Sequence, residues 1–157
     1  DGYVTCWDEF QFLPGALEAI YRFDLTFDHI IIVTNQQGVG KGLMTIEEVS
    51  EIHHHMLQEI KNAHGRIDQI YVCPHLAIHD PVCRKPNPGM AIQAQQDFPD
   101  IDFSRSIMIG DTDTDILFGK KLGMYTVRIG TKSDGNVEKA DLNVNSLYDF
   151  SLFLPQQ

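Results

Sequence analysis

The sequence IIIVTNQQGVGKG (residues 30–42) contains an apolar strand, a polar strand end and a glycine-rich turn in immediate succession. Its first four residues are all β-branched and predict a buried strand that ends at Thr34 and Asn35. After the turn, Thr45 and Glu48 have the spacing of a capping box and predict the start of a long helix. A buried strand followed by a helix is the repeating unit of a parallel sheet.

The same alternation continues along the chain. Further strands are predicted at residues 69–72, 106–109, 125–129 and 140–144, and helices at residues 16–23, 45–63, 89–98, 113–122 and after 144. This order predicts an α/β fold, a three-layer Rossmann-like doubly wound parallel sheet, formed by residues 1–157 as a single domain. Because ligands of such sheets bind beyond the carboxyl ends of the strands, we expect the functional site there.

Composition and charge exclude several classes of protein. The net charge of −10 argues against a nucleic-acid partner, because binding to phosphate backbones needs clustered Lys and Arg. No apolar run has the length of a membrane span, so no membrane partner is predicted. The odd count of three cysteines lacks a dense disulfide spacing and predicts a cytoplasmic protein whose thiols are free or bound to metal. We also expect a monomer.

The residues that follow the predicted strands suit a phosphoryl group. Thr34 and Asn35 are neutral donors for phosphate oxygens, and Lys85 is a point charge for the same oxygens. Asp111 follows an apolar strand and is a hard oxygen ligand for Mg²⁺, with Asp115 one helical turn further on. The alternative for these carboxylates is helix capping alone. Together the residues predict phosphoryl chemistry with Mg²⁺ as cofactor.

A second group of residues has the types that bind zinc. Cys73, His75 and Cys83 lie within eleven residues, and thiolates with an imidazole at that spacing suit a structural Zn²⁺ that holds an irregular loop. The alternative is a pair of reduced cysteines packed in the loop. A fourth ligand is required, and neither His79 nor Asp80 completes a standard spacing.

These segments resemble the phosphatases of the haloacid dehalogenase (HAD) superfamily, closest to the family of heptose 1,7-bisphosphate 7-phosphatases and histidinol-phosphatases. The resemblance extends from residue 2 to residue 147, and so over nearly the whole chain. The residues that carry it are, in order, Val33-Thr34-Asn35-Gln36, Cys73-Pro74-His75, Cys83-Arg84-Lys85-Pro86, Pro88-Gly89-Met90 and Gly110-Asp111.

The resemblance implies a HAD-like fold without a separate cap domain and a role for each matching residue. Thr34 and Asn35 would contact phosphate, Lys85 would supply the cation, and Asp111 would bind magnesium with Asp115 behind it. The positions on the substrate side are Gly2, Tyr3, Gln36, Gln37 and Arg84. Cys73, His75 and Cys83 match three zinc ligands of the family, while Pro81 occupies the position of the fourth.

The nucleophile of the family has no counterpart in this sequence. The resemblance implies hydrolysis of a small sugar-phosphate monoester through an aspartyl-phosphate intermediate, with histidinol phosphate as the alternative substrate. The attacking Asp belongs to an Asp-x-Asp-Gly-Thr motif on a central strand upstream of Gly2, and the 157 residues contain no such motif. We therefore expect the polypeptide to continue upstream of Asp1; a natural truncation or a non-catalytic phosphate-binding relative is the alternative.

Overall fold

The computed structural model describes residues 3–130 and 139–155, which form parallel strands and helices in alternation. The strands are β1 (Ile31–Asn35), β2 (Gln69–Cys73), β3 (Ile107–Gly110), β4 (Tyr125–Ile129) and β5 (Leu142–Val144). The α-helices are α1 (Ala16–Thr26), α2 (Gln37–Gly40), α3 (Ile46–Asn62), α4 (Gly89–Asp97), α5 (Asp113–Lys121) and α6 (Leu147–Ser151). Short 3₁₀ turns are η1 (Trp7–Glu9), η2 (Ala77–His79) and η3 (Phe103–Arg105).

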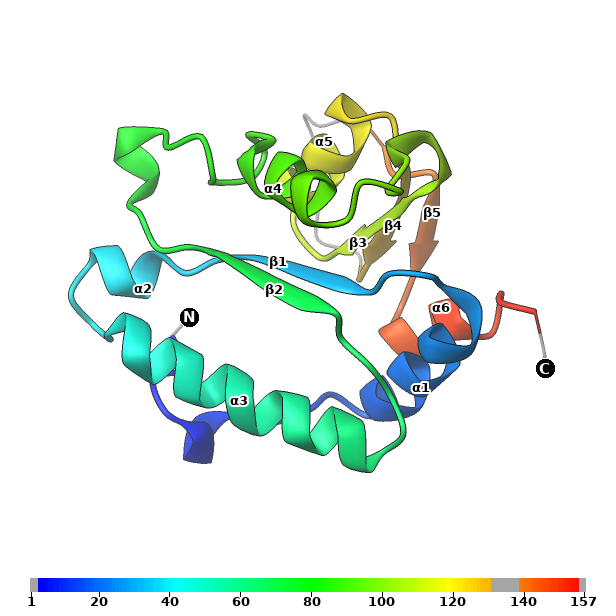
Figure 1. Ribbon diagram of the computed structural model, residues 1–157, viewed down its shortest axis with the longest axis horizontal. Helices are drawn as coiled ribbons and strands as arrows, with labels where there is room; N and C mark the ends of the chain where they lie inside the picture. The colour runs from blue at the N-terminus through cyan, green and yellow to red at the C-terminus, as the bar shows by residue number, and fades with distance from the viewer. Residues whose placement is uncertain (1–2, 131–138, 156–157) are drawn as a thin grey trace.

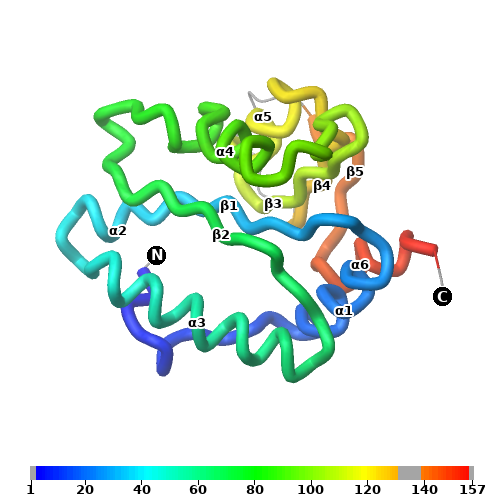
Figure 2. Tube along the Cα trace, viewed as in Figure 1, coloured from blue at the N-terminus to red at the C-terminus, as the bar shows by residue number. Residues whose placement is uncertain are grey.

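The elements form three layers, as the sequence predicts. Helices α1, α3 and α6 lie on one side of the strands, and α4 and α5 lie on the other (Figure 1). The trace in Figure 2 shows β1 and β2 side by side, with the long helix α3 as the connection between them. All strand pairs are parallel, so the doubly wound α/β prediction is confirmed.

The strands form two sheets rather than one. In the first sheet β1 pairs with β2, in a register that runs from Ile31 opposite Gln69 to Asn35 opposite Cys73. The second sheet has the order β3-β4-β5. Within the described residues, no ladder of hydrogen bonds joins β1 to β3. The division therefore leaves one edge of β1 and one edge of β3 without a strand neighbour.

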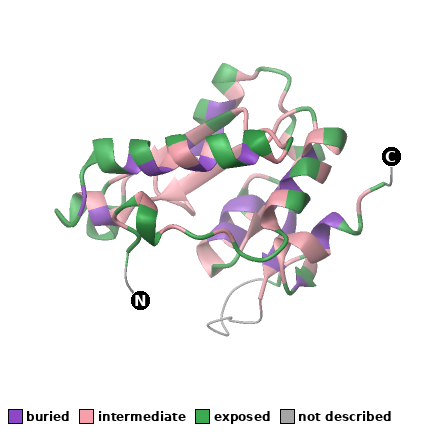
Figure 3. Cartoon of the chain, turned by 90° about the horizontal axis from the view of Figure 1, so that it is seen from below, coloured by how far each residue is buried: buried purple, intermediate pink, exposed green. Residues whose placement is uncertain are grey.

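The larger apolar cluster on the side of α1 and α3 joins both helices to the strands. Ala19 and Phe23 of α1, Ile60 of α3 and Val127 of β4 are buried together. Full burial of an Ile or Phe side chain contributes about 1.5–3 kcal/mol, so this cluster holds the helical layer on the strands. Buried and exposed residues alternate along α3 in Figure 3, because its apolar residues recur at helical spacing.

Two elements differ from the prediction. The glycine-rich turn after β1 contains the short helix α2, which packs closely on the loop that follows β2. A Cβ at Gly40 would lie 2.9 Å from the carbonyl oxygen of Pro74, so only glycine fits this approach. Strand β5 is shorter than predicted and begins at Leu142.

In the described part of the chain, none of the helices is both long and apolar enough to cross a membrane.

Candidate active site

Strand β1 ends in side chains that connect two distant segments of the chain. The side-chain oxygen of Asn35 accepts a hydrogen bond from the backbone N–H of Lys85 at 3.1 Å, and its amide donates to the Lys85 carbonyl at 3.4 Å. Gln36 donates through Nε2 to the hydroxyl of Thr34 at 3.0 Å. The strand end therefore positions Lys85 although 50 residues separate it from Asn35.

The Lys85 side chain extends between the two sheets. Its ammonium donates to the carbonyl oxygen of Val33 at 3.0 Å and to Oδ1 of Asp115 at 2.6 Å. The side chains of Lys85 and Asp115 are only 11% and 7% exposed. Removal of one partner from a buried ion pair of this kind strongly destabilises the fold, because the remaining charge is left buried without compensation. Lys85 thus joins the unpaired edge of β1 to the start of α5.

The start of α5 is held by a reciprocal cap. The hydroxyl of Thr112 accepts from the N–H of Asp115, and Oδ2 of Asp115 accepts from the N–H of Thr112, each at 3.2 Å. A Cβ at Gly110 would overlap the Asp115 side chain, so glycine is required at the end of β3. Asp111 follows it and is exposed at the carboxyl end of the strand. The turn therefore aims one carboxylate at solvent and the other at Lys85.

Arg128 is a site residue that the sequence reasoning missed. It lies on β4, is 5% exposed, and pairs with the Asp113 carboxylate. Its guanidinium also donates to the backbone carbonyl of Asp111 at 3.2 Å. Arg128 therefore supports the turn that presents Asp111. The sequence signal was a single basic residue within the otherwise apolar end of a predicted strand.

The predicted substrate-side residues lie around α2 and the loop before Lys85. The Lys41 ammonium donates to the Tyr3 hydroxyl at 2.9 Å. This hydrogen bond, then one with Gln37, lowers the pKa of Tyr3 below its usual value. Gln37 also accepts from the N–H of Ala77 at 2.7 Å, which ties α2 to that loop. Arg84 Nη1 is buried and has no hydrogen-bond partner among the described residues. Gly2 lies outside the described residues.

The structure does not support the zinc prediction at the two cysteines on which it depended. Cys73 and Cys83 form a disulfide, so neither sulfur is a thiolate that could bind a metal ion. His75 is exposed, and the described residues contain no group of three or more His, Cys, Asp or Glu that could hold a metal ion. The expectation of reduced thiols at these two positions is wrong as well, whereas Cys6 is free and exposed.

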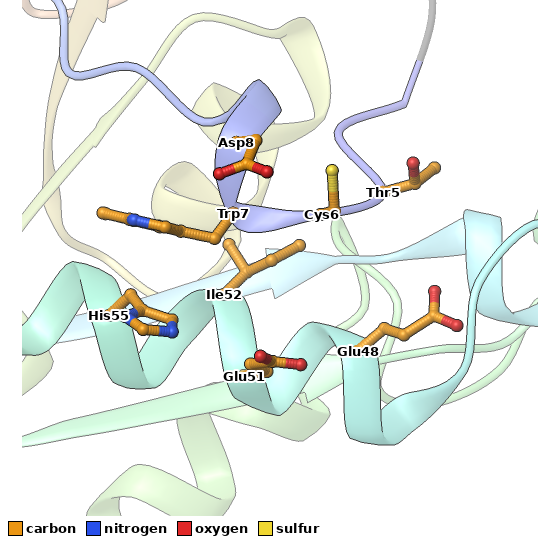
Figure 4. Close-up of a pocket in the computed structure, with 8 residues that line it drawn as sticks. All are labelled: Thr5, Cys6, Trp7, Asp8, Glu48, Glu51, Ile52 and His55. Carbon is orange, nitrogen blue, oxygen red and sulfur yellow. The ribbon is translucent and has the colours of Figure 1, made fainter.

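A pocket of about 490 Å³ lies away from the predicted phosphate residues, between the N-terminal segment and α3. Figure 4 shows its lining, in which residues of the N-terminal segment face one side of the helix. The Trp7 ring stacks on His55 with ring centroids 5.1 Å apart. Thr34, Lys85 and Asp111 do not line this pocket. Its residues are Thr5, Cys6, Trp7, Asp8, Glu48, Glu51, Ile52 and His55.

Comparisons with known proteins agree with this arrangement. A family model described as HAD-hydrolase-like matches residues 82–149. A D-glycero-alpha-D-manno-heptose-1,7-bisphosphate 7-phosphatase of Mycobacterium bovis is 36% identical over 155 residues, which cover 96% of this chain and 80% of the relative. A D-glycero-beta-D-manno-heptose-1,7-bisphosphate 7-phosphatase of Rhodopseudomonas palustris is 33% identical over 79% of this chain and 72% of its own.

The fold is shared with a solved structure as well. The D,D-heptose 1,7-bisphosphate phosphatase of B. bronchiseptica, crystallised with magnesium and phosphate, superposes with a TM-score of 0.88 at 26% identity. The match covers 96% of this chain and 87% of that one. The chain therefore belongs to the HAD-like hydrolases. Within them, it belongs to the family of the heptose-1,7-bisphosphate 7-phosphatases, which confirms the resemblance found in the sequence.

Proposed function

We propose that this chain is a magnesium-dependent phosphatase that hydrolyses a small sugar-phosphate monoester, with heptose 1,7-bisphosphate as its substrate. The observation that carries the proposal is the junction at Lys85, where an ammonium, the Asn35 amide and the Asp115 carboxylate meet between two parallel strand ends. The names of the relatives support the same reaction and substrate class. We also propose a monomeric protein without a nucleic-acid partner, because its net charge of −10 opposes self-association and contact with phosphate backbones.

Asp111 fits the role of magnesium ligand. Its carboxylate is a hard oxygen donor, it is exposed at a strand end, and the N-terminus of α5 follows it directly. Asp115 is already engaged by Lys85 and Thr112, so its role would be to orient the site from behind. When bound, the ion would neutralise charge on the phosphoryl group. Among the described residues, Asp111 is the one exposed carboxylate of this kind at this strand end. The other ligands of the magnesium ion would therefore come from elsewhere.

The residues of this chain act on the phosphoryl group by donating hydrogen bonds. Thr34, Asn35 and Lys85 would stabilise the negative charge that develops on the equatorial oxygens in the transition state. Asp115 holds the Lys85 ammonium in place through their ion pair. Because hydrogen bonds within the chain hold these groups before substrate arrives, little reorganisation is needed during the reaction.

The nucleophile would be an Asp on a strand upstream of Asp1, inserted between β1 and β3. The two unpaired edges support this position, and Lys85 would then lie beside the attacking carboxylate. That carboxylate would attack phosphorus in line, a second upstream Asp would protonate the leaving oxygen, and water would release phosphate from the aspartyl-phosphate. A chain that has lost this strand and only binds phosphate is the alternative.

The charges on the substrate side favour a bisphosphate over histidinol phosphate. Tyr3, Gln36, Gln37 and Arg84, together with Gly2, would contact the sugar. Arg84 and the neighbouring Lys41 add positive charge there, which attracts a second phosphate group. The same charge repels the ammonium group of histidinol phosphate.

A substrate panel tests the proposal. Heptose 1,7-bisphosphate and histidinol phosphate would be compared by phosphate release, using a polypeptide that includes the residues encoded before Asp1. We expect magnesium-dependent turnover with a higher kcat/KM for the bisphosphate, and loss of turnover in an Asp111→Asn variant. Preference for histidinol phosphate would overturn the substrate assignment.

The 157-residue chain alone provides the matched control. We expect it to release no phosphate because it lacks the attacking Asp. Equal turnover by this chain would show that the nucleophile lies within it, contrary to the proposal. Absence of turnover in both forms, with phosphate still bound, would favour the non-catalytic alternative.

A further inference from the structure

Three aspartates lie close together in the sequence at the start of α5, and two buried cations pair with two of them. Lys85 pairs with Asp115. Arg128 pairs with Asp113, and the side chains of this second pair are only 7% and 13% exposed. The third aspartate, Asp111, is exposed at the carboxyl end of β3. The turn thus presents one carboxylate to solvent, while the other two lie inward against a cation.

Arg128 reaches both sides of Thr112 from the neighbouring strand. In the register of β3 and β4 it lies opposite Gly110, the residue before Asp111. Nη1 of its guanidinium donates to the Asp111 carbonyl at 3.2 Å, and Nη2 donates to the Asp113 carboxylate. A planar guanidinium holds two acceptors in a fixed geometry, which a lysine ammonium cannot reproduce. Arg128 therefore fixes the backbone that carries the Asp111 side chain.

The same pair decides which carboxylate is available to a cation. Asp113 lies two residues from Asp111, and without Arg128 its carboxylate would compete for a hard cation and repel an approaching phosphate. The converse holds for Arg128, which already contacts the Asp111 backbone. Without Asp113, its guanidinium would be available to the Asp111 carboxylate and would compete with magnesium for it.

We propose that Arg128 and Asp113 are positioning residues that set the magnesium affinity of Asp111. Arg128 holds the Asp111 backbone and keeps the Asp113 carboxylate turned inward, while Asp113 keeps Arg128 away from the Asp111 carboxylate. Mutation of a residue that orients a metal ligand from behind typically lowers metal affinity by about 10–100-fold. This inference rests on the proposed function, because it concerns the magnesium site of the same proposal.

The test compares Arg128→Lys with Arg66→Lys in a polypeptide that includes the residues encoded before Asp1. Arg66 is the matched control, because its guanidinium also donates to a carboxylate, that of Asp24, and to a backbone carbonyl, that of Phe27. It precedes β2 and so lies at the opposite end of the strands from the proposed site. Both variants keep the positive charge and lose the planar fork, and urea titrations would establish that both are folded.

Manganese binding is the first measurement. Mn²⁺ prefers the same oxygen ligands as Mg²⁺, and electron paramagnetic resonance detects the Mn²⁺ that stays free. We expect Arg128→Lys to raise the dissociation constant for Mn²⁺ on the order of tenfold, and Arg66→Lys to leave it unchanged. Asp113→Asn should weaken binding on the same scale, because it releases Arg128 toward Asp111. Wild-type affinity in Arg128→Lys or in Asp113→Asn would overturn the inference, and so would an equal loss of affinity in Arg66→Lys.

A double variant keeps the inference testable if Arg128→Lys does not fold. Arg128→Met/Asp113→Leu replaces the pair with apolar side chains, a change that buried ion pairs often tolerate. It removes the hold on the Asp111 backbone without leaving a charge buried and unpaired. The dissociation constant for Mn²⁺ should again rise on the order of tenfold, and wild-type affinity in this variant would overturn the inference.

Turnover is the second measurement. In Arg128→Lys, the magnesium concentration at half-maximal turnover should rise on the order of tenfold, while turnover at saturating magnesium stays close to the wild-type value. A loss that saturating magnesium does not restore would overturn the inference. Weaker Mn²⁺ binding in Arg128→Lys, without turnover in any form, would support the inference and count against the proposed phosphatase. A wild-type polypeptide that binds no Mn²⁺ would overturn both.

Discussion

Lys85 has two buried contacts with different consequences. Its hydrogen bond to Val33 occupies an edge carbonyl of β1, and its ion pair with Asp115 connects that edge to α5. The first contact positions the ammonium, whereas the second pairs its charge with a carboxylate in a site with little water. A neutral side chain at residue 85 would therefore remove a donor and leave the Asp115 carboxylate buried without its partner.

Replacement of Lys85 tests whether this lysine takes part in the reaction or only contributes positive charge to the protein. We expect Lys85→Ala to lower turnover by roughly two to three orders of magnitude, the scale for one preorganised donor. Lys121→Ala is the control, because Lys121 is an exposed lysine at the end of α5. Steady-state kinetics would compare the turnover of both variants with that of the wild type. Equal turnover in the Lys85 variant and the wild type would exclude Lys85 from the reaction.

Tyr71 predicts a dependence of stability on pH in the alkaline range. Burial, followed by the 2.5 Å hydrogen bond to Asp97, raises the pKa of Tyr71 to about 12. The fold thus favours the neutral phenol, whose contribution is complete below the usual tyrosine pKa of about 10. It is lost as the pH rises through about 12. Absorbance titration should show one late phenolate whose ionisation accompanies unfolding, and Tyr71→Phe should remove it.

At the scale of single elements, the caps of α3 and α5 allow a matched comparison. Thr45 accepts from the N–H of Glu48, and Thr112 accepts from the N–H of Asp115, at 3.1 and 3.2 Å. Each Thr→Ala change should lower the free energy of unfolding by about 1 kcal/mol in urea titrations. Only Thr112→Ala should also lower turnover, on the order of tenfold, because only that cap positions Asp115 against Lys85. Similar turnover losses in both variants would show that the cap acts through stability alone.

Sequence patterns predicted the elements well where the signal is local. Apolar runs bounded by turn residues identified the strands, and Thr45 identified the start of α3. Residues that follow strands, such as Asn35 and Lys85, could be assigned to one edge because parallel strands end together. The helix α2 was missed, because its glycines are typical of a turn and its conformation depends on packing against the loop after β2.

Long-range partners could not be predicted in the same way. The ion pairs of Lys85 with Asp115 and of Arg128 with Asp113 join residues whose distance in the sequence carries no periodic signal. The spacing of Cys73 and Cys83 suits either a metal site or a covalent bond. Only the fold brings the two sulfurs together, and it determines which of these chemistries occurs.

For the molecule as a whole, the division of the sheet should be visible in hydrogen exchange. Strand β4 is paired on both edges, whereas β1 and β3 each have a strand neighbour on one edge only in the described structure. In the 157-residue chain we expect the slowest exchange in β4 and faster exchange at the unpaired edges of β1 and β3. In a polypeptide with the upstream residues, those edges should become as protected as β4. Equal protection of the three strands in the shorter chain would contradict this expectation.

The open edges of β1 and β3 also affect how copies of the chain behave toward one another. An extended segment from a second molecule finds the same backbone groups available as a segment of the same molecule would. At high concentration this favours exchange of strands between copies and, eventually, aggregation. A strand that fills this position would thus act as a solubility determinant as well as a carrier of the nucleophile.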